Sequence, residues 1–345
     1  MAGADPTAGG GLTVAVTGPT GDIGRSLTRA LERSREVGRI TAMARSPFDP
    51  AAEGLRKTVY RRADVLDADA VAEVIAGADV VVHLAFVIMG DIAETTSVNL
   101  QGSRNVFEAA IAAGASRLVY TSSVAAYGFG ADNPPLLTED LEPRGTRRHY
   151  YSAQKAELEM VLRELLEGVP TQAYVFRPCI VAGPDAPALL ESIPYLQLSD
   201  RMPAAVLRAL ELMPMIKPVI PDPGVPFQLV HHDDVATALR AAVLGRGEPG
   251  IYNLAGDGTV TMADIADALG WYSIPTPDLA VDAAAELVAR LPFVPAQAQW
   301  IESLRRPVLM DTSRARRLLR WRPRHDARTT LQDTVAATRS ARLLR

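Results

Sequence analysis

The chain has 345 residues, 48% of them hydrophobic, so it can bury a substantial core in one large domain or two joined ones. Its 36 basic and 40 acidic residues give a net charge of −4, which excludes a general electrostatic attraction to nucleic acid. The single cysteine excludes an internal disulfide and is typical of a reducing compartment. Residues 1–11 lack the pattern of a signal peptide and indicate a disordered tail, and the most apolar run, 80–89, is too short to span a bilayer. We therefore expect a soluble, cytoplasmic protein with no membrane partner.

A glycine-rich turn follows the first predicted strand and opens a helical pattern. Residues 14–24 read Val-Ala-Val-Thr-Gly-Pro-Thr-Gly-Asp-Ile-Gly. Gly18 permits a tight turn, Gly21 lets the backbone approach a ligand, and Gly24 allows close packing of helix on strand. The unpaired N–H groups at the start of the helix suit a pyrophosphate. The G-x-x-G-x-x-G spacing differs from the standard dinucleotide fingerprint, so a turn that is glycine-rich only for packing is the alternative.

Short β-branched runs then alternate with helical patterns. Strands are predicted at 39–44, 58–61, 78–84, 117–121 and 171–176, and helices at 67–76 (capped by Asp67), 97–113 and 150–167. This alternation predicts an α/β fold with a Rossmann-type, doubly wound parallel sheet covered on both faces. Ligands of such sheets bind beyond the carboxyl ends of the strands.

The pattern changes after Pro178. Residues 184–226 are rich in proline, leucine and methionine, with one predicted helix at 204–212. Later elements are predicted as a helix at 235–244, a strand at 251–254, a helix at 261–269 capped by Thr261, and a helix at 314–324 with a solvated basic face rather than a phosphate-binding patch. We predict a dinucleotide-binding domain at 12–180, to which residues 228–258 return, and a smaller, mostly helical substrate-binding lobe from 181–227 and 259–345.

Tyr151 and Lys155 are four residues apart in the predicted helix 150–167 and therefore lie on one face. An ammonium near a phenol lowers the pKa of the phenol and makes it a usable acid or base near neutral pH. Ser122 and Ser123 follow the strand 117–121, where a hydroxyl can bind the reacting oxygen of a substrate. The alternatives are an exposed surface pair and serines that only end a strand. Tyr150 is a rival phenol about 100° around the helix.

In this order, the three features resemble the extended short-chain dehydrogenases/reductases, and within them the NAD-dependent epimerase/dehydratase family. The resemblance covers nearly the whole chain. It rests on 17–24 (T-G-x-x-G-x-x-G), 63–65 (the segment that holds adenine), 83–85 (beside the adenine ribose), 120–128 (S-S-x-x-x-Y-G), 177–178, 230–234 and 252–254.

The resemblance implies roles for these residues. Tyr151 would be the acid/base, Lys155 its tuner and a ribose anchor, and Ser123 the group that binds the reacting oxygen. Asn99 matches a family asparagine to which we assign a structural role. A homodimer packed through helices 97–113 and 150–167 is also implied. With Arg45, the predicted cofactor contacts are Gly18, Thr20, Gly21, Asp22, Ile23, Asp64, Val65, Leu84, Ala85, Thr121, Tyr151, Lys155 and Pro178.

The end of the second strand bears on the choice of nucleotide. Strand 39–44 is followed by Arg45 and Ser46, without the carboxylate that binds the ribose 2′-hydroxyl of NAD. A guanidinium there suits a 2′-phosphate, so the sequence favours NADP over NAD. The alternative is that Arg45 only stacks on adenine and that NAD binds.

The substrate is predicted to be a carbonyl or alcohol of low charge. Phe227 occupies the place where nucleotide-sugar enzymes of the resembled family carry a phosphate-binding arginine, and the apolar segment 184–226 has few basic residues. Its apolar side chains could equally form core or an interface. No metal site is predicted at 231–234, because consecutive residues cannot all face one ion, and Asp233 or Asp234 is expected to cap a helix. Cys179 is expected to pack.

The sequence thus predicts an NAD(P)-dependent oxidoreductase that moves a hydride between nicotinamide and a carbonyl or alcohol carbon, with Ser123, Tyr151 and Lys155 handling the oxygen and the proton. One alternative is a nucleotide-sugar epimerase or dehydratase with tightly bound NAD. Another is a non-catalytic nucleotide-binding regulator, which would have no need of all three residues.

Overall fold

A parallel sheet of seven strands is the centre of the computed structural model, which describes residues 10–88, 92–191, 193, 195–196, 217–277 and 306–343. In order across the sheet the strands are β10 (Gly250–Leu254), β6 (Gln172–Pro178), β5 (Arg117–Thr121), β4 (Val80–His83), β1 (Leu12–Thr17), β2 (Val37–Ala44) and β3 (Thr58–Arg62). The strand order reverses between β1 and β4, which is where ligands bind in such sheets. The predicted α/β fold with a doubly wound parallel sheet is confirmed.

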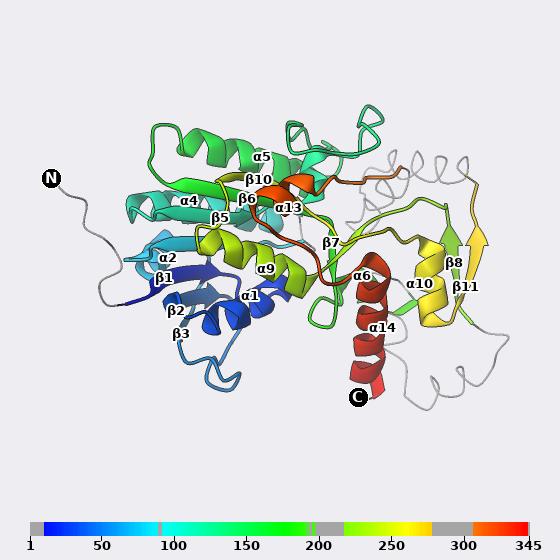
Figure 1. Cartoon of the computed structure of the whole chain (residues 1–345), viewed down its shortest axis with the longest axis horizontal. Helices are drawn as coiled ribbons and strands as arrows, with labels where there is room; N and C mark the ends of the chain where they lie inside the picture. Colours follow the sequence, from blue (N-terminus) through cyan, green and yellow to red (C-terminus); the bar gives the residue numbers. More distant parts are fainter. Residues whose placement is uncertain are drawn as a thin grey trace.

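Helices cover both faces of the sheet (Figure 1). On one face α1 (Asp22–Glu32) packs against α9 (His232–Val243); on the other, α2 (Ala68–Ile75), α4 (Gly102–Ala112) and α5 (Tyr150–Leu165) pack side by side. Strand residues alternate between the two layers. Val14 and Val16 join the core that includes α1 and α9, whereas Ala15 joins the core that includes α2 and α4. The continuous apolar strands predicted from the sequence are therefore buried on both sides.

The remaining elements are shorter. They are α3 (Ile92–Thr96), the π-helical turn η1 (Ser97–Gln101), the 3₁₀ helix η2 (Val124–Tyr127), β7 (Ile180–Ala182), α6 (Ala188–Glu191), β8 (Val219–Asp222), β9 (Leu229–His231), α10 (Met262–Leu269), β11 (Tyr272–Pro275), α13 (Ser313–Leu318) and α14 (Ala327–Leu343). Strand β7 pairs with β9, and β8 pairs with β11. A separate hydrophobic cluster joins α6, β8, α10 and α14 at the right of Figure 1.

Three predicted helices have different bounds in the structure. The helix at 97–113 is instead α3, a π-helical turn and α4, and the turn coincides with Asn99, whose side chain bonds the backbone of Val87. The helix at 314–324 ends at Leu318, because Arg320 has a left-handed φ of 52°. The predicted helix at 204–212 lies outside the described residues.

The third difference is at α9, which begins at His232 rather than at Val235. Its cap is His231, whose side chain accepts a hydrogen bond from the Asp233 amide at 3.2 Å. Neither aspartate is the cap, so that prediction was wrong. Asp234 instead accepts hydrogen bonds from the backbone and ring of His325. The caps predicted for α2 and α10 are confirmed: Asp67 accepts from Ala70, and Thr261 forms a capping box with Asp264.

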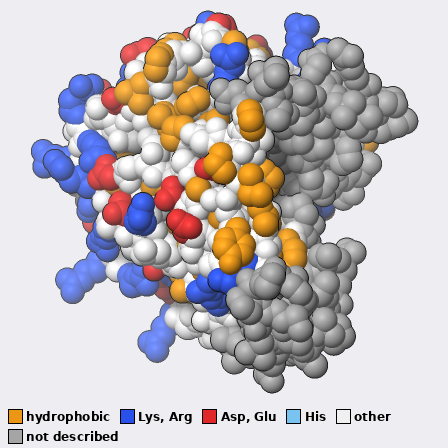
Figure 2. Space-filling model, turned by 90° about the vertical axis from the view of Figure 1, so that its right-hand side faces the viewer, with side chains coloured by type: hydrophobic (Ala, Val, Ile, Leu, Met, Phe, Trp, Pro, Cys, Tyr) orange, Lys and Arg blue, Asp and Glu red, His pale blue; other side chains and the backbone are white. Residues whose placement is uncertain are grey.

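The surface has apolar as well as charged areas. Figure 2 shows hydrophobic side chains gathered on the face that forms the right-hand side of Figure 1. Three large side chains of the β8–β11 sheet, Val219, Tyr272 and Ile274, are about half exposed. Within the described ranges, no helix has the length and apolar character needed to cross a membrane.

A buried ion pair joins α5 to the sheet. The Arg177 side chain on β6 donates to the Glu159 carboxylate on α5, with Nη2 at 2.5 Å from Oε2 and Nε at 2.9 Å from Oε1. Both side chains are almost fully buried. Ser122 Oγ donates to the same carboxylate at 2.5 Å, and Arg177 Nη1 donates to the Leu141 carbonyl. The pair is therefore satisfied on both sides, as buried charges must be.

Replacing Glu159 by Gln leaves the Arg177 guanidinium buried without a counter-charge. We expect a loss of about 3–5 kcal/mol in the free energy of unfolding, measured by urea denaturation at pH 7. The matched control is Arg163→Gln on the same helix, which breaks an exposed pair with Glu142 and should cost less than about 1 kcal/mol. Equal losses in the two variants would contradict this account of α5.

Candidate active site

The glycine turn after β1 has the tight geometry that its sequence predicts. Gly18 has a φ of +76°, and a Cβ there would lie 2.8 Å from the Ala85 amide nitrogen. A Cβ on Gly24 would lie 2.1 Å from the Gly18 carbonyl oxygen. By contrast, a Cβ on Gly21 would meet nothing closer than 3.6 Å. Packing within the chain thus requires glycine at 18 and 24, whereas Gly21 faces room.

The first turn of α1 begins at this glycine turn. Gly21 is the cap residue and provides no side-chain hydrogen bond, so the first N–H groups of the helix lack a side-chain acceptor. Asp22 lies in the first turn, and its pKa is raised by burial and by the nearby Glu191 and Asp185 carboxylates. Thr20 lies in the glycine turn, and its carbonyl accepts a hydrogen bond from the Arg25 side chain at 3.4 Å. Ile23 packs partly buried against the core.

A buried chain of hydrogen bonds fixes the end of β4 beside this turn. His83 lies between Thr17 Oγ1, 2.7 Å from its Nδ1, and Ser103 Oγ, 2.8 Å from its Nε2. Burial lowers the pKa of His83 to about 3, so the ring is neutral. Leu84 then donates its amide to the Thr17 carbonyl, which brings the predicted contacts Leu84 and Ala85 next to Gly18.

The other predicted adenine-side residues lie at the ends of β2 and β3. Asp64 is half-buried and its carboxylate accepts from the Leu66 amide at 3.0 Å. Val65 is buried against Gly102 of α4, where a Cβ would lie 2.4 Å from its side chain. Arg45 is exposed directly after β2, and its carbonyl accepts from the Arg62 side chain at 2.8 Å.

Ser123, Tyr151 and Lys155 come together at the carboxyl end of β5. Ser123 caps η2, with its Oγ accepting from the Ala125 amide at 3.1 Å, and its side chain is hydrogen-bonded to that of Tyr151. Lys155 Nζ lies 5.9 Å from the centroid of the Tyr151 ring and donates to the Thr121 carbonyl at 2.9 Å. All three side chains are buried. Pro178 ends the neighbouring strand β6 at the same edge of the sheet.

The structure does not show the effect of Lys155 on the pKa of Tyr151 that the sequence predicts. The pKa of Tyr151 is raised to about 12, chiefly by burial, and the hydrogen bond with Ser123 opposes the rise. The pKa of Lys155 is itself lowered to about 7 by burial, with Glu159 opposing. Lys155 is not among the groups that lower the pKa of Tyr151; its Nζ donates to the Thr121 carbonyl and lies over an aromatic ring.

That ring is Phe86, which the sequence analysis missed. Lys155 Nζ lies 3.7 Å from the centroid of the Phe86 ring, a cation–π contact, and Phe86 meets Tyr151 edge-on at 5.4 Å. Phe86 directly follows the predicted segment 83–85, which is the signal that could have found it. Thr121 Oγ1 is a second feature of the same place, because it is buried and has no hydrogen-bond partner among the described residues.

Two neighbouring residues have structural contacts. The Tyr150 hydroxyl donates to the Ile88 carbonyl, so the rival phenol is bound to the loop after β4. Asn99 is fully buried, accepts from the Val87 amide at 2.8 Å, and donates to the Val87 carbonyl and to Gln154. These contacts agree with the structural role predicted for Asn99.

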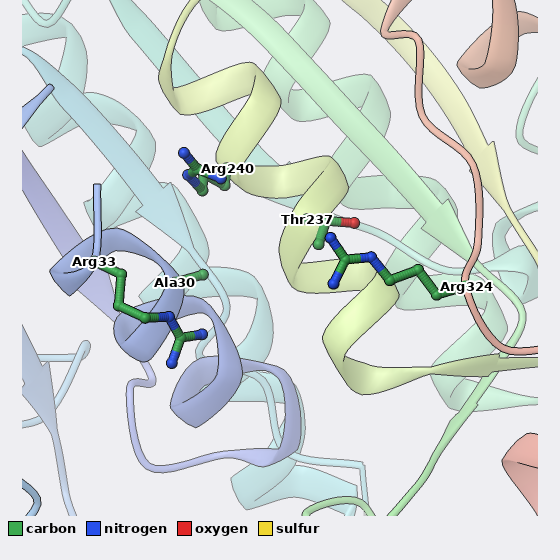
Figure 3. Close-up of a pocket in the computed structure, with 5 residues that line it drawn as sticks. All are labelled: Ala30, Arg33, Thr237, Arg240 and Arg324. Atoms are coloured by element: carbon green, nitrogen blue, oxygen red, sulfur yellow. The ribbon is translucent and has the colours of Figure 1, made fainter. Parts of the chain in front are cut away.

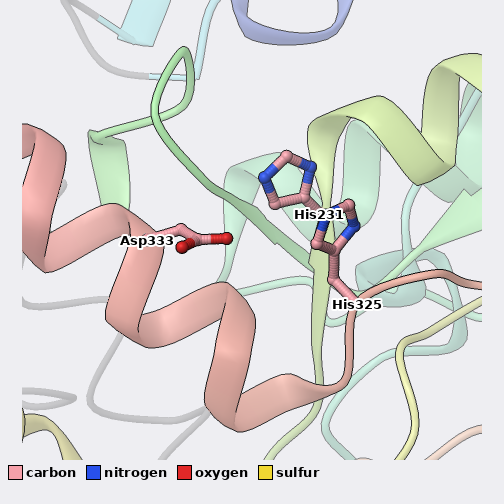
Figure 4. A group of neighbouring side chains, drawn as sticks. All are labelled: His231, His325 and Asp333. Carbon is pink, nitrogen blue, oxygen red and sulfur yellow. The ribbon is translucent and has the colours of Figure 1, made fainter.

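The histidines near α9 belong to a second cluster. His231 and His325 stack with ring centroids 4.0 Å apart, and one ligand atom each from His231, His325 and Asp333 lies within 4.8 Å of the others (Figure 4). His231 Nδ1 accepts from the Asp233 amide, and His325 Nδ1 bonds Asp234 at 2.9 Å. The Nδ1 atom of each ring is therefore already engaged in a hydrogen bond. Cys179 is buried and its thiol pKa is raised, so it packs as an inert side chain.

A protein-family model described as the NAD dependent epimerase/dehydratase family matches residues 14–255. The chain belongs to this family. Because the match covers most of the chain, the family resemblance inferred from the sequence is confirmed.

Curated relatives of the family match parts of the chain. Human 3 beta-hydroxysteroid dehydrogenase type 7 is 32% identical over 188 residues, covering 50% of this chain and 51% of its own length. The N-acetyl-alpha-D-glucosaminyl-diphospho-ditrans,octacis-undecaprenol 4-epimerase of Escherichia coli O157:H7 is 36% identical over 125 residues, covering 35% and 36%. The chain thus spans about half the length of the first relative and about a third of the second.

A solved structure of UDP-glucuronic acid 4-epimerase from Bacillus cereus in complex with NAD has a TM-score of 0.71 at 17% identity, covering 96% of this chain and 99% of the other. UDP-glucose 4-epimerase from Thermotoga maritima has a TM-score of 0.69 at 19% identity, covering 96% and 99%. These likenesses show that the fold is that of the family.

The lowered pKa of Lys155 makes the stability of the protein depend on pH. Below pH 7 the ammonium is charged in both the folded and unfolded states, and its burial penalty is fully present. Between about pH 7 and the ordinary lysine pKa of 10.5 the folded state releases its proton first, so the penalty fades as pH rises. The free energy of unfolding of the natural protein, minus that of Lys155→Met, should therefore rise from pH 6.5 to pH 10 by a few kcal/mol. Urea denaturation at several pH values measures this difference, and a difference that is flat with pH would refute the burial account.

Proposed function

We propose that this family member is an NAD(P)-dependent oxidoreductase that interconverts a carbonyl and an alcohol at Tyr151. The observation that supports this proposal most directly is that Tyr151, Ser123 and Lys155 lie buried together at the carboxyl end of β5. When bound, the nicotinamide cofactor supplies or accepts the hydride at the substrate carbon.

The side chains handle the proton and the oxygen. With a pKa of about 12, Tyr151 holds its proton at neutral pH and can donate it to an oxygen that gains charge during carbonyl reduction. The Ser123 hydroxyl, which is hydrogen-bonded to Tyr151, would stabilise that charge together with the phenol. In the direction of alcohol oxidation, Tyr151 would have to lose its own proton first, because only the phenolate can accept a proton from the alcohol. Lys155 supplies a group that can carry positive charge near neutral pH beside the phenol.

The residues around the glycine turn fit a dinucleotide. The room at Gly21 and the uncapped N–H groups of α1 suit a pyrophosphate, and the unpartnered Thr121 Oγ1 offers a hydrogen bond near Lys155. The residues that we propose to hold the cofactor are those predicted from the sequence: Gly18, Thr20, Gly21, Asp22, Ile23, Arg45, Asp64, Val65, Leu84, Ala85, Thr121, Tyr151, Lys155 and Pro178.

We propose NADP as the preferred nucleotide. The observation in favour is the exposed Arg45, which directly follows Ala44, the last residue of β2. An arginine rather than a carboxylate therefore stands at the end of this strand. The next carboxylate, Asp49, accepts from the Ala51 and Ala52 amides in its own turn. A guanidinium matches the geometry and charge of a 2′-phosphate.

For the substrate we propose an apolar carbonyl or alcohol. By its alignment to the resembled family, Phe227 occupies the place of a phosphate-binding arginine; its backbone bridges Val260, and its ring packs against the cluster that joins α6, β8, α10 and α14. The human relative carries the name of a hydroxysteroid dehydrogenase, and this supports a hydrophobic substrate.

A second candidate is a nucleotide-sugar epimerase or dehydratase. It is favoured by the fold likeness to UDP-sugar 4-epimerases over nearly the whole chain and by the bacterial 4-epimerase relative. A non-catalytic regulator is disfavoured, because it would not need Tyr151, Ser123 and Lys155 together. The homodimer and the cytoplasmic location stay predictions; the surface of α5 predicted to pair carries Met160, which is 45% exposed.

Tyr151→Phe tests the catalytic assignment. Removing the phenolic hydroxyl takes away the proton donor, so turnover should fall by about 10²–10⁴-fold or more, while nucleotide affinity stays nearly unchanged. Turnover is measured with a panel of hydrophobic ketones and secondary alcohols, and affinity by fluorescence titration of the reduced nucleotide. The matched control, Tyr150→Phe, should keep most of the activity. Activity retained in Tyr151→Phe would refute the assignment.

Arg45→Ala tests the nucleotide preference. The variant should lose affinity for NADPH by about tenfold or more and change little for NADH, since one charged hydrogen-bonding partner of a phosphate is removed. Arg39→Ala, an exposed arginine toward the other end of β2, is the control and should leave both affinities unchanged. Equal losses for the two nucleotides in Arg45→Ala would rule out a 2′-phosphate contact.

The two candidate functions differ in how they use the cofactor. Purification without added nucleotide, followed by denaturation and chromatography of the released material, should yield an empty protein that then binds NADPH more tightly than NADH. That result supports an exchangeable co-substrate and therefore a reductase or dehydrogenase. Stoichiometric NAD in the released material would instead support the epimerase or dehydratase.

A further inference from the structure

A small cavity lies on the far side of α1 from the glycine turn. Its volume is about 210 Å³, below the roughly 300–1,000 Å³ of sites for drug-sized ligands. It lies between α1, α9 and the segment that leads into α14 (Figure 3). The lining residues are Ala30, Arg33, Thr237, Arg240 and Arg324. We propose that this cavity binds a small phosphate dianion, either free phosphate or the phosphoryl group of a small metabolite.

The lining is positively charged. Arg33 comes from the end of α1, Arg240 from α9 and Arg324 from the segment before α14, so three distant parts of the sequence each place one arginine beside the cavity (Figure 3). None of these three side chains forms an ion pair with another residue in the described part of the chain. The neighbouring carboxylate Glu36 interacts weakly with Arg240 and is bonded by Arg246 at 3.3 Å. Positive charge is thus left over in the cavity.

One donor of the residues that line the cavity lacks an acceptor. The Arg240 Nε–H group is buried and has no hydrogen-bond partner among the described residues. A buried donor of this kind calls for an acceptor, because its desolvation is otherwise uncompensated. The Thr237 hydroxyl does not supply it, since it donates to the Asp234 carbonyl at 2.7 Å and accepts from Trp321 Nε1 at 3.2 Å. Thr237 instead fixes Trp321, three residues before Arg324.

The chemistry of the lining selects the ligand. Guanidinium groups present planar pairs of N–H donors that match phosphate oxygens, and three of them suit a doubly charged anion. The described residues that line the cavity include no carboxylate to bind a cation, and Ala30 is the apolar one among them. It is separate from the proposed pyrophosphate site, because α1 has 11 residues and is therefore about 16 Å long. The proposal does not depend on the proposed enzymatic function.

Isothermal titration calorimetry tests the proposal on the full chain. Inorganic phosphate is titrated at constant ionic strength set with chloride, with and without NADPH or NAD, so that any phosphate bound at the proposed cofactor site is recognised as the part that a nucleotide displaces. We expect saturable binding at one site, weakened by about tenfold or more in Arg33→Gln and in Arg324→Gln. Both side chains are exposed enough for the variants to keep their fold, which circular dichroism checks. The matched control is Arg322→Gln, an exposed arginine of the same basic run that does not line the cavity, and it should bind as the natural protein does.

A second titration with glycerol 3-phosphate identifies the source of the phosphoryl group. Tighter binding of the ester than of inorganic phosphate indicates a metabolite, and the reverse indicates the free ion; either result supports the site. Absence of saturable binding, or binding that Arg33→Gln and Arg324→Gln leave unchanged, overturns the proposal. A loss in Arg322→Gln as large as in the other two variants also overturns it, because it would indicate general attraction to the basic run.

Discussion

Glu159 and Arg177 meet in the interior between α5 and β6, and the helix that carries Tyr151 and Lys155 is fixed to the sheet at this point. Glu159 is one helical turn beyond Lys155, and its carboxylate also accepts from Ser122, the neighbour of Ser123. One ion pair therefore aligns the serine strand end with the tyrosine helix. A charge pair is more directional than apolar packing, so it fixes the register of α5 along the sheet as well as its distance.

The same burial that fixes the site also changes its electrostatics. Lys155 and Tyr151 lie where water is excluded, so their neutral forms are favoured: the pKa of the lysine falls to about 7 and that of the tyrosine rises to about 12. Phe86 covers the ammonium without neutralising it. Any charge brought near these groups will act strongly, since little water screens it. The pKa values of Lys155 and Tyr151 will consequently depend on the charge of any molecule bound beside them.

Much of the fold and the site was predictable from local sequence. Periodicity predicted the strands, and parallel order followed from their alternation with helices, because each crossover needs a helix. Tyr151 and Lys155 were found through their spacing. The contacts between distant residues were not: the position of Phe86 directly after segment 83–85 places it near the site but does not indicate that its ring meets Lys155. The cap of α9 was mispredicted because His231 competes with two good capping residues, and tertiary bonds to His325 decide the outcome. The π-helical turn at Asn99 likewise depends on a bond to a different segment.

The strand order means that the sheet is completed late in the synthesis of the chain. Strand β10 completes the sheet beside β6, and α9 packs against α1 on one face of the sheet, yet both come after residue 231. When β6 has just emerged from the ribosome, α1 lacks this neighbour and the sheet has an open edge. At about 5–20 residues per second, the 76 residues that follow Pro178, up to Leu254, take roughly 4–15 s to arrive. During that interval the nascent chain carries an unpaired strand edge, the kind of surface that chaperones shield and that other chains can join.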